Sequence, residues 1–127
     1  MGQLSHPSAI RIRAMVDLAP GQNRDVCERF SSFVKTYRRE MLTRISESLH
    51  PNWELIVALR PDIRNGGRPH IVIVGHLGRL MIRVTEIPAN ADFMSDGVMK
   101  SAADESARMI KHWDPESAVS GPSHREP

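Results

Sequence analysis

The chain has 127 residues, of which 40% are hydrophobic and 25% charged. This composition fits one ordinary globular domain and excludes a disordered chain. The longest apolar run, residues 55–59, is five residues long, far below the ~20 that a helix needs to cross a bilayer. The first residues lack the basic and apolar segments of a secretory signal, and a single cysteine permits no internal disulfide. We therefore expect a cytoplasmic protein with no membrane partner.

Charge is unevenly distributed along the chain, although the net charge is only +2. Residues 1–85 carry 13 Lys and Arg against seven Asp and Glu, whereas residues 86–127 carry four against eight. Fourteen of the 17 cations are arginine, whose planar guanidinium group suits phosphate better than the point charge of lysine does. This favours a polyanionic partner, and the alternative explanation is a solvated polar surface.

The first residues with a clear pattern form a predicted strand. Residues 1–9 show no periodicity, and we expect disordered tails at 1–9 and 114–127 on either side of one domain at 10–113. From Ile10 to Asp17 apolar and polar residues alternate, which is typical of a half-buried strand.

A long amphipathic helix is predicted next. Apolar residues recur every three or four positions between Asn23, a candidate N-cap, and Leu49. Pro51 ends the pattern, because proline cannot continue the helical hydrogen-bond ladder. Extrapolation at 100° per residue places Arg44 inside the apolar stripe. Either the side chain of Arg44 extends past the edge of the core or the helix bends or breaks near Thr43, and we favour the break.

Three strand patterns follow in quick succession, at residues 53–60, 70–75 and 80–86. The first alternates between apolar and polar residues, and the second is apolar on both faces, as in the centre of a sheet. The sequence PDIRNGGRP is predicted to form a long turn, and residues 75–79 a tight connection. Such short connections predict an antiparallel meander.

The last predicted element is a second amphipathic helix, with Ser95 as its N-cap and Pro115 as its stop. Its buried side is expected to carry Val98, Met99, Ala102, Met109, Ile110 and Trp113. The elements therefore follow the order β-α-β-β-β-α. We predict an α+β fold in which two helices pack on one face of a four-stranded, mostly antiparallel sheet.

The spacing of reactive side chains gives no support for a metal centre or an enzyme. His70 and His76 share strand parity, but six residues of extended chain place them about 20 Å apart, too far to ligate one ion. Cys27 lies near the apolar stripe and is predicted to be a small core residue. Asp104 and Glu105 are adjacent on a helix and point about 100° apart, so they cannot face each other as acid and base. We predict no catalytic residue, metal or cofactor.

Basic residues lie on most of the predicted elements, and a surface where they converge would bind phosphate without catalytic apparatus. Aromatic residues are nearly absent outside the predicted core. Recognition of folded RNA by its shape and backbone is therefore favoured over stacking on unpaired bases. The candidate nucleic-acid-binding residues are Arg11, Arg13, Lys35, Arg38, Arg39, Arg79 and Arg83.

The order of elements resembles that of the ribosome hibernation promoting factor and ribosome-associated inhibitor family, also called sigma-54 modulation proteins. The resemblance covers residues 10–113 and rests mainly on HIVIVGHLGRLMIRVTE at 70–86 and SDGVMKSAADESARMI at 95–110. The form resembled is the short one, without a carboxy-terminal dimerisation domain. The resemblance implies a non-enzymatic RNA-binding protein of translation regulation in the stress response. Such a protein docks on the small ribosomal subunit, on ribosomal RNA where messenger and transfer RNA would sit.

The resemblance also implies that basic residues of both helices contact the RNA, which adds Lys100, Arg108 and Lys111 to the candidates. The chain departs from the family in three respects. Its first helix is about two turns longer, Asp96 stands where an aromatic residue is usual, and acidic residues balance the charge of the second helix. These departures predict weaker RNA affinity, or a protein partner instead.

Two further functions remain open from the sequence. A messenger-cleaving toxin of the RelE type has a similar small fold and would need a general acid and base, for which Tyr37, His70 and His76 are candidates beside the arginines. A protein-binding module, such as an inhibitor or an assembly component from a mobile element, would use the two-sided apolar strand at 70–75 as a sheet face for its partner.

Overall fold

The computed structural model describes residues 10–18, 24–45, 52–88, 91–92 and 94–115. The sequence-predicted tail at 1–9, most of the tail at 114–127, the candidate cap Asn23 and the helix stop Pro51 lie outside these residues. The described part contains the elements β1 (Arg11–Val16), α1 (Arg24–Arg44), β2 (Glu54–Asp62), the 3₁₀ turn η1 (Ile63–Asn65), β3 (Arg68–Leu77), β4 (Leu80–Ile87) and α2 (Asp96–Trp113).

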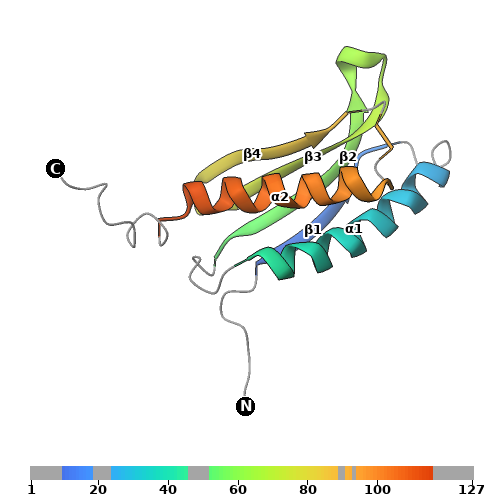
Figure 1. The fold of residues 1–127 in the computed structure, drawn as a ribbon. Coiled ribbons are helices and arrows are strands. Elements are labelled where there is room, and N and C mark those ends of the chain that lie inside the picture. The colour runs from blue at the N-terminus through green and yellow to red at the C-terminus, as the bar shows by residue number, and fades with distance from the viewer. Residues whose placement is uncertain (1–9, 19–23, 46–51, 89–90, 93, 116–127) are drawn as a thin grey trace.

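The four strands form one sheet in the order β1-β2-β3-β4. β1 pairs with β2 in parallel, and the pairs β2-β3 and β3-β4 are antiparallel. Both helices cover the same face of this sheet (Figure 1). The α+β class, the element order and the mostly antiparallel sheet predicted from the sequence are confirmed. We call the face without helices the open face.

The core lies between the helices and the sheet. α1 buries the stripe that its periodicity predicts: Phe30, Phe33, Val34, Tyr37 and Met41. The helix-facing side of the sheet and the inner side of α2 complete one hydrophobic cluster with this stripe. Cys27 is half-buried and packs against the cluster, in keeping with its prediction as a small core residue.

The first helix ends close to the break that the sequence predicts near Thr43. Its last residue is Arg44, and most of the predicted continuation to Leu49 lies outside the described residues. In the last turn the Thr43 hydroxyl donates to the carbonyl of Glu40 (2.7 Å), and the Arg44 guanidinium donates to the same carbonyl (2.9 Å). The Ile45 amide still donates to the Met41 carbonyl (3.0 Å), so the helical ladder continues to the end of this described segment.

The hairpin between β2 and β3 corrects the predicted long turn at 61–69. Pro61 pairs with Pro69, so the turn proper covers only 63–67. Gly66 and Gly67 carry it at φ 70° and 79°, which L side chains rarely adopt. This part of the hairpin extends beyond β1 and β4, so both of its strands are edges and tolerate proline. The next connection is also shorter than predicted, because β3 continues to Leu77.

The second helix begins as predicted, with the Ser95 side chain accepting from the Val98 amide (3.5 Å). Its far end differs from the prediction. Trp113, expected on the buried side, is 45% exposed. The small residues Ala102, Ala103, Ser106 and Ala107 are buried instead. The buried tryptophan is Trp53, whose indole donates to Asp114 (2.9 Å), and this bond ties the end of α2 to the start of β2.

A buried hydrogen-bond relay joins the two helices. The Tyr37 hydroxyl donates to the Ser106 hydroxyl (2.7 Å), which donates to the Ala102 carbonyl (2.7 Å). Burial raises the pKa of Tyr37 above its ordinary value. Tyr37 is therefore a neutral structural donor inside the core.

Replacing Tyr37→Phe removes one donor of this relay and leaves the Ser106 oxygen with one partner fewer. We expect the free energy of unfolding to fall by about 1–2 kcal/mol, as for other buried hydrogen bonds. Urea denaturation followed by circular dichroism measures the change. Leu42→Ala on the exposed face of the same helix is the control, with an expected change within about 0.5 kcal/mol. Equal stability of Y37F and the wild type would contradict the account.

Candidate functional site

Five of the predicted RNA-binding residues lie on two neighbouring elements, α1 and β1. The guanidinium of Arg38 on α1 donates to the carbonyl of Ile12 on β1 (Nη2–O 2.8 Å). Two further exposed cations on α1 are Lys35, three residues before Arg38, and Arg39, the residue after it. An arginine flanks Ile12 on either side in β1. We name this surface the cationic edge; its members are Arg11, Arg13, Lys35, Arg38 and Arg39.

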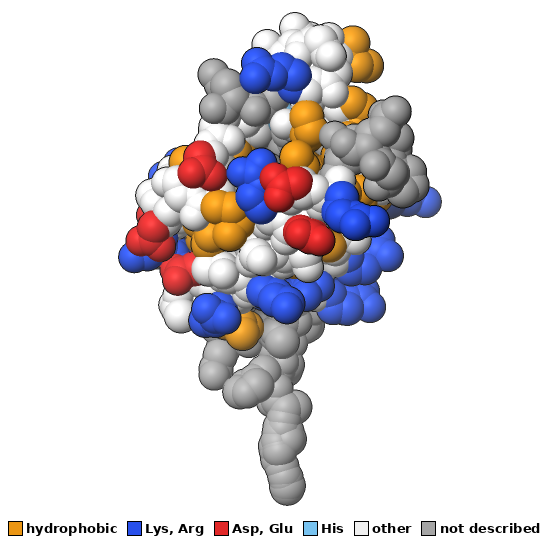
Figure 2. Space-filling view, turned by 90° about the vertical axis from the view of Figure 1, so that its right-hand side faces the viewer, with side chains coloured by type: hydrophobic (Ala, Val, Ile, Leu, Met, Phe, Trp, Pro, Cys, Tyr) orange, Lys and Arg blue, Asp and Glu red, His pale blue; other side chains and the backbone are white. Residues whose placement is uncertain are grey.

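Most of the positive charge on the cationic edge is uncompensated. Of the five cations of the cationic edge, only Arg13 pairs with a carboxylate of a described residue, that of Glu54 (2.9 Å). The other four cations form no ion pair within the described part of the chain. Figure 2 shows Lys and Arg side chains gathered toward the lower margin of the molecule, at the height of α1 and β1 in Figure 1.

The two candidates of the last hairpin lie apart from the cationic edge. Arg79 is exposed in the turn between β3 and β4. Arg83 lies on the open face in the same row as Arg13, three strand spacings or about 14 Å away. Its guanidinium also lies 3.4 Å from Glu86. The structure therefore does not bring these two residues into the cationic edge.

The three candidates on α2 are separated from the cationic edge as well. α2 packs beside β4, at the far side of the sheet from β1. Lys100 pairs with Asp96 (3.3 Å) and Arg108 pairs with Glu105, one turn away in each case. Lys111 is exposed and has no ion pair among the described residues. The charge balance that the sequence predicts for this helix is thus formed partly by contacts within it, and Asp104 pairs with Arg44 of α1.

A second group of polar side chains, missed by the sequence analysis, lies on the open face at the base of the β2-β3 hairpin. His70 Nδ1 lies 2.8 Å from Glu86 Oε2 and 3.5 Å from Asp62 Oδ2. The guanidinium of Arg64 bridges the same carboxylates, at 2.7 Å from Glu86 and 3.2 Å from Asp62. We name Asp62, Arg64, His70 and Glu86 the hairpin cluster.

The hairpin cluster combines burial with charge. The side chains of Asp62 and His70 are 3% and 8% exposed, whereas that of Arg64 is 68% exposed. Hydrogen bonds from the Asn65 amide (2.6 Å) and from Arg64 hold the pKa of Asp62 below its usual value, against the opposing effect of burial. The two carboxylates raise the pKa of Arg64.

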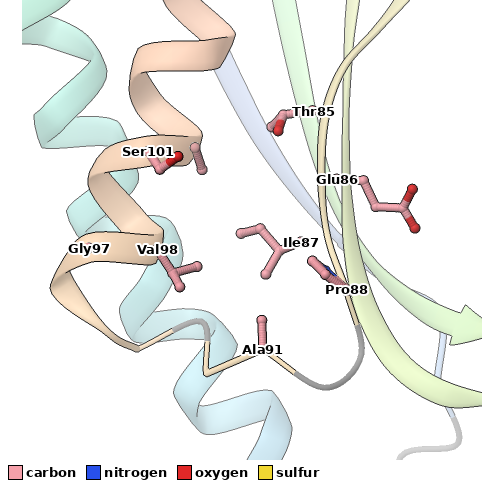
Figure 3. Close-up of a pocket in the computed structure, with 9 residues that line it drawn as sticks. Thr85, Glu86, Ile87, Pro88, Ala91, Gly97, Val98 and Ser101 are labelled. Atoms are coloured by element: carbon pink, nitrogen blue, oxygen red, sulfur yellow. The ribbon is translucent and has the colours of Figure 1, made fainter.

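The spacing of residues along the chain could not reveal this cluster. Strand parity groups His70 with His76, whereas the carboxylates beside His70 lie at the end of β2 and on β4. A β-bulge between β3 and β4 near Ile73 shifts their register and sets Glu86 beside Val72. The side chain of Glu86 points away from α2 (Figure 3), toward the open face where His70 lies.

The candidate acid and base residues of a toxin are divided between the two faces of the sheet. Tyr37 is fully buried between the helices, where Ser106 holds its hydroxyl. His70 lies on the opposite face, in the hairpin cluster. Tyr37 and His70 therefore do not share one site.

A pocket of about 300 Å³ lies between the end of β4 and the start of α2. Figure 3 shows Thr85, Ile87, Ala91 and Val98 bordering this space. Its one charged lining residue, Glu86, points away from it. The pocket thus offers a small, mainly apolar lining without a group for acid-base chemistry.

Comparison with protein-family models, curated proteins and solved structures gives no match for this chain. In the described part of the chain, no helix is long and apolar enough to cross a membrane.

Proposed function

We propose that this protein is a non-enzymatic RNA-binding protein that docks on the small ribosomal subunit through its cationic edge and inhibits translation by occlusion. The observation that carries the proposal is the number of exposed, unpaired cations on two neighbouring elements. Lys35, Arg38 and Arg39 lie on α1, Arg11 and Arg13 lie on β1, and a hydrogen bond from Arg38 to the Ile12 carbonyl joins the two elements. Among the described residues, only Arg13 of the five is paired with a carboxylate. Such an excess of positive charge attracts a polyanion.

The side chains of the cationic edge favour the RNA backbone over the bases. Four of the five are arginines, whose guanidinium forks donate two parallel hydrogen bonds to a phosphate. The described aromatic residues of α1, and Trp53 just before β2, are buried, and Trp113 lies at the end of α2 instead. With no exposed ring at the cationic edge, recognition of folded RNA by shape and phosphate is the favoured mode.

The ribosome is proposed as the partner because the fold has the element order that the resemblance to hibernation factors implies. The two helices contribute unequally. Lys35, Arg38 and Arg39 of α1 form no ion pair among the described residues, whereas Lys100 and Arg108 of α2 are paired within their own helix. We therefore place the RNA contact on α1 and β1 rather than on both helices.

A protein partner on the open face is the second candidate function. Met15 and Met81 on the outer strands are 48% and 64% exposed there, and Ile56 and Val74 lie half-buried on the strands between them. Apolar side chains grouped on a sheet face commonly mark a binding surface. Co-purification from lysate with and without nuclease separates the two functions, because a protein partner survives the treatment.

The salt dependence of RNA binding tests the cationic edge. If the five cations each neutralise one phosphate, the logarithm of the affinity falls with the logarithm of salt concentration with a slope of about −4.5, on the rule for duplexes. Three of these contacts are removed in the triple variant Arg11→Gln, Lys35→Gln and Arg39→Gln. We therefore expect a slope of about −1.8 for this variant. Binding to a folded fragment of small-subunit ribosomal RNA, measured by fluorescence anisotropy, gives both slopes.

The matched control removes the same charge from α2, by Lys100→Gln, Arg108→Gln and Lys111→Gln. We expect this variant to change the slope by less than about 1. Both variants should remain folded, since surface substitutions of this kind change stability by about 0.5 kcal/mol or less. Equal loss of slope in the two variants would contradict a localised cationic edge.

Sedimentation tests whether the ribosome is the partner. In a low-salt sucrose gradient of a lysate from its host, the wild type is expected in the small-subunit fractions. The R11Q/K35Q/R39Q variant is expected at the top of the gradient, because its diminished positive charge no longer holds it on the ribosomal RNA even at low salt. Absence of the wild type from every ribosomal fraction would defeat the proposed partner.

A further inference from the structure

We propose that Asp62, His70 and Glu86 of the hairpin cluster form a binding site for one divalent transition-metal ion of the zinc class. Each side chain offers one ligand atom, and the three atoms lie within 4.8 Å of one another. The site is separate from the cationic edge and does not depend on RNA binding. Imidazole and carboxylate groups are ligands that Zn²⁺ accepts.

The positions of the ligand atoms already approach those around a bound ion. Ligand atoms about 2.1 Å from a tetrahedral zinc ion are about 3.4 Å from one another. His70 Nδ1 lies 3.5 Å from Asp62 Oδ2 and 2.8 Å from Glu86 Oε2. Little movement of the β2 and β3 backbone is therefore needed, and an incoming water molecule completes the four ligands.

The hydrogen bonding of His70 leaves room for such an ion. Both carboxylates approach the same ring nitrogen, Nδ1, which carries at most one proton. Its other nitrogen, Nε2, has no hydrogen-bond partner among the described residues, although the side chain is only 8% exposed. In the neutral tautomer that carries its proton on Nε2, the lone pair of Nδ1 is available to bind a metal ion.

Arg64 supplies the cation that a metal ion would replace. Its guanidinium bridges the two carboxylates, but its side chain is 68% exposed and it lies in the η1 turn. It can therefore swing into solvent when an ion enters. The cluster also borders an open pocket of about 340 Å³ on the open face, which gives an ion a path from solvent. Arg64 thus acts as a competitor, and its removal should strengthen metal binding.

Titration with Zn²⁺ against a chromophoric chelator tests the site. The protein carries no tag and has Cys27→Ser in every variant, so that the half-buried thiol binds no zinc. We expect one ion per chain in this background. We expect at least a tenfold loss of affinity in Glu86→Gln, which keeps the size of the side chain, and in His70→Ala. Arg64→Gln should bind several-fold more tightly.

His76→Ala is the matched control, because His76 lies on the same strand and the same face, at a distance from the cluster. Its zinc affinity should equal that of the starting protein. Visible absorption of bound Co²⁺ reports the coordination geometry, and circular dichroism reports folding of each variant. Failure to bind zinc, equal affinity in E86Q and the starting protein, or weaker binding by R64Q would overturn the proposal.

Discussion

The parallel pairing of β1 with β2 is the constraint on which the rest of the structure depends. Two parallel neighbours cannot be joined by a tight turn, so the chain must cross over between them, and α1 is that crossover. The crossover places the helix beside β1, where Arg38 reaches the carbonyl of Ile12. α1 and the edge strand β1 thereby become neighbouring elements, and each carries exposed cations.

Several cations elsewhere in the fold are paired. Arg44 pairs with Glu40 and Asp104, which ties the end of α1 to α2, and Lys100 and Arg108 of α2 pair within their own helix. The hairpin cluster neutralises Arg64 with two carboxylates on the open face. Arg60, Arg68, Arg79 and Lys111 also form no ion pair among the described residues, so the cationic edge is distinguished by having four unpaired cations on two adjoining elements. The net charge of +2 gives no indication of this distribution.

The sequence predicts the elements of this fold well because their signals are local. The periodicity of α1, the Ser95 cap and the alternation in β2 each depend on residues close in the chain. Contacts between elements far apart in the chain are not predicted by local signals. The exposure of Trp113 depends on how α2 lies on the sheet, and the contact of His70 with Glu86 depends on a β-bulge that no local pattern predicts. Of the candidate site, the residue types and the α1 stripe were predictable, but which cations lie on neighbouring elements and which are paired with carboxylates was not.

The central claim is that RNA contacts one edge of the molecule. Hydrogen–deuterium exchange, measured on the protein alone and bound to purified small ribosomal subunits, tests it most directly. The account predicts slower exchange on binding in β1 and in residues 35–44 of α1, where amides become shielded or held more rigidly. Unchanged exchange there, together with slower exchange confined to α2 or to the open face, would contradict it.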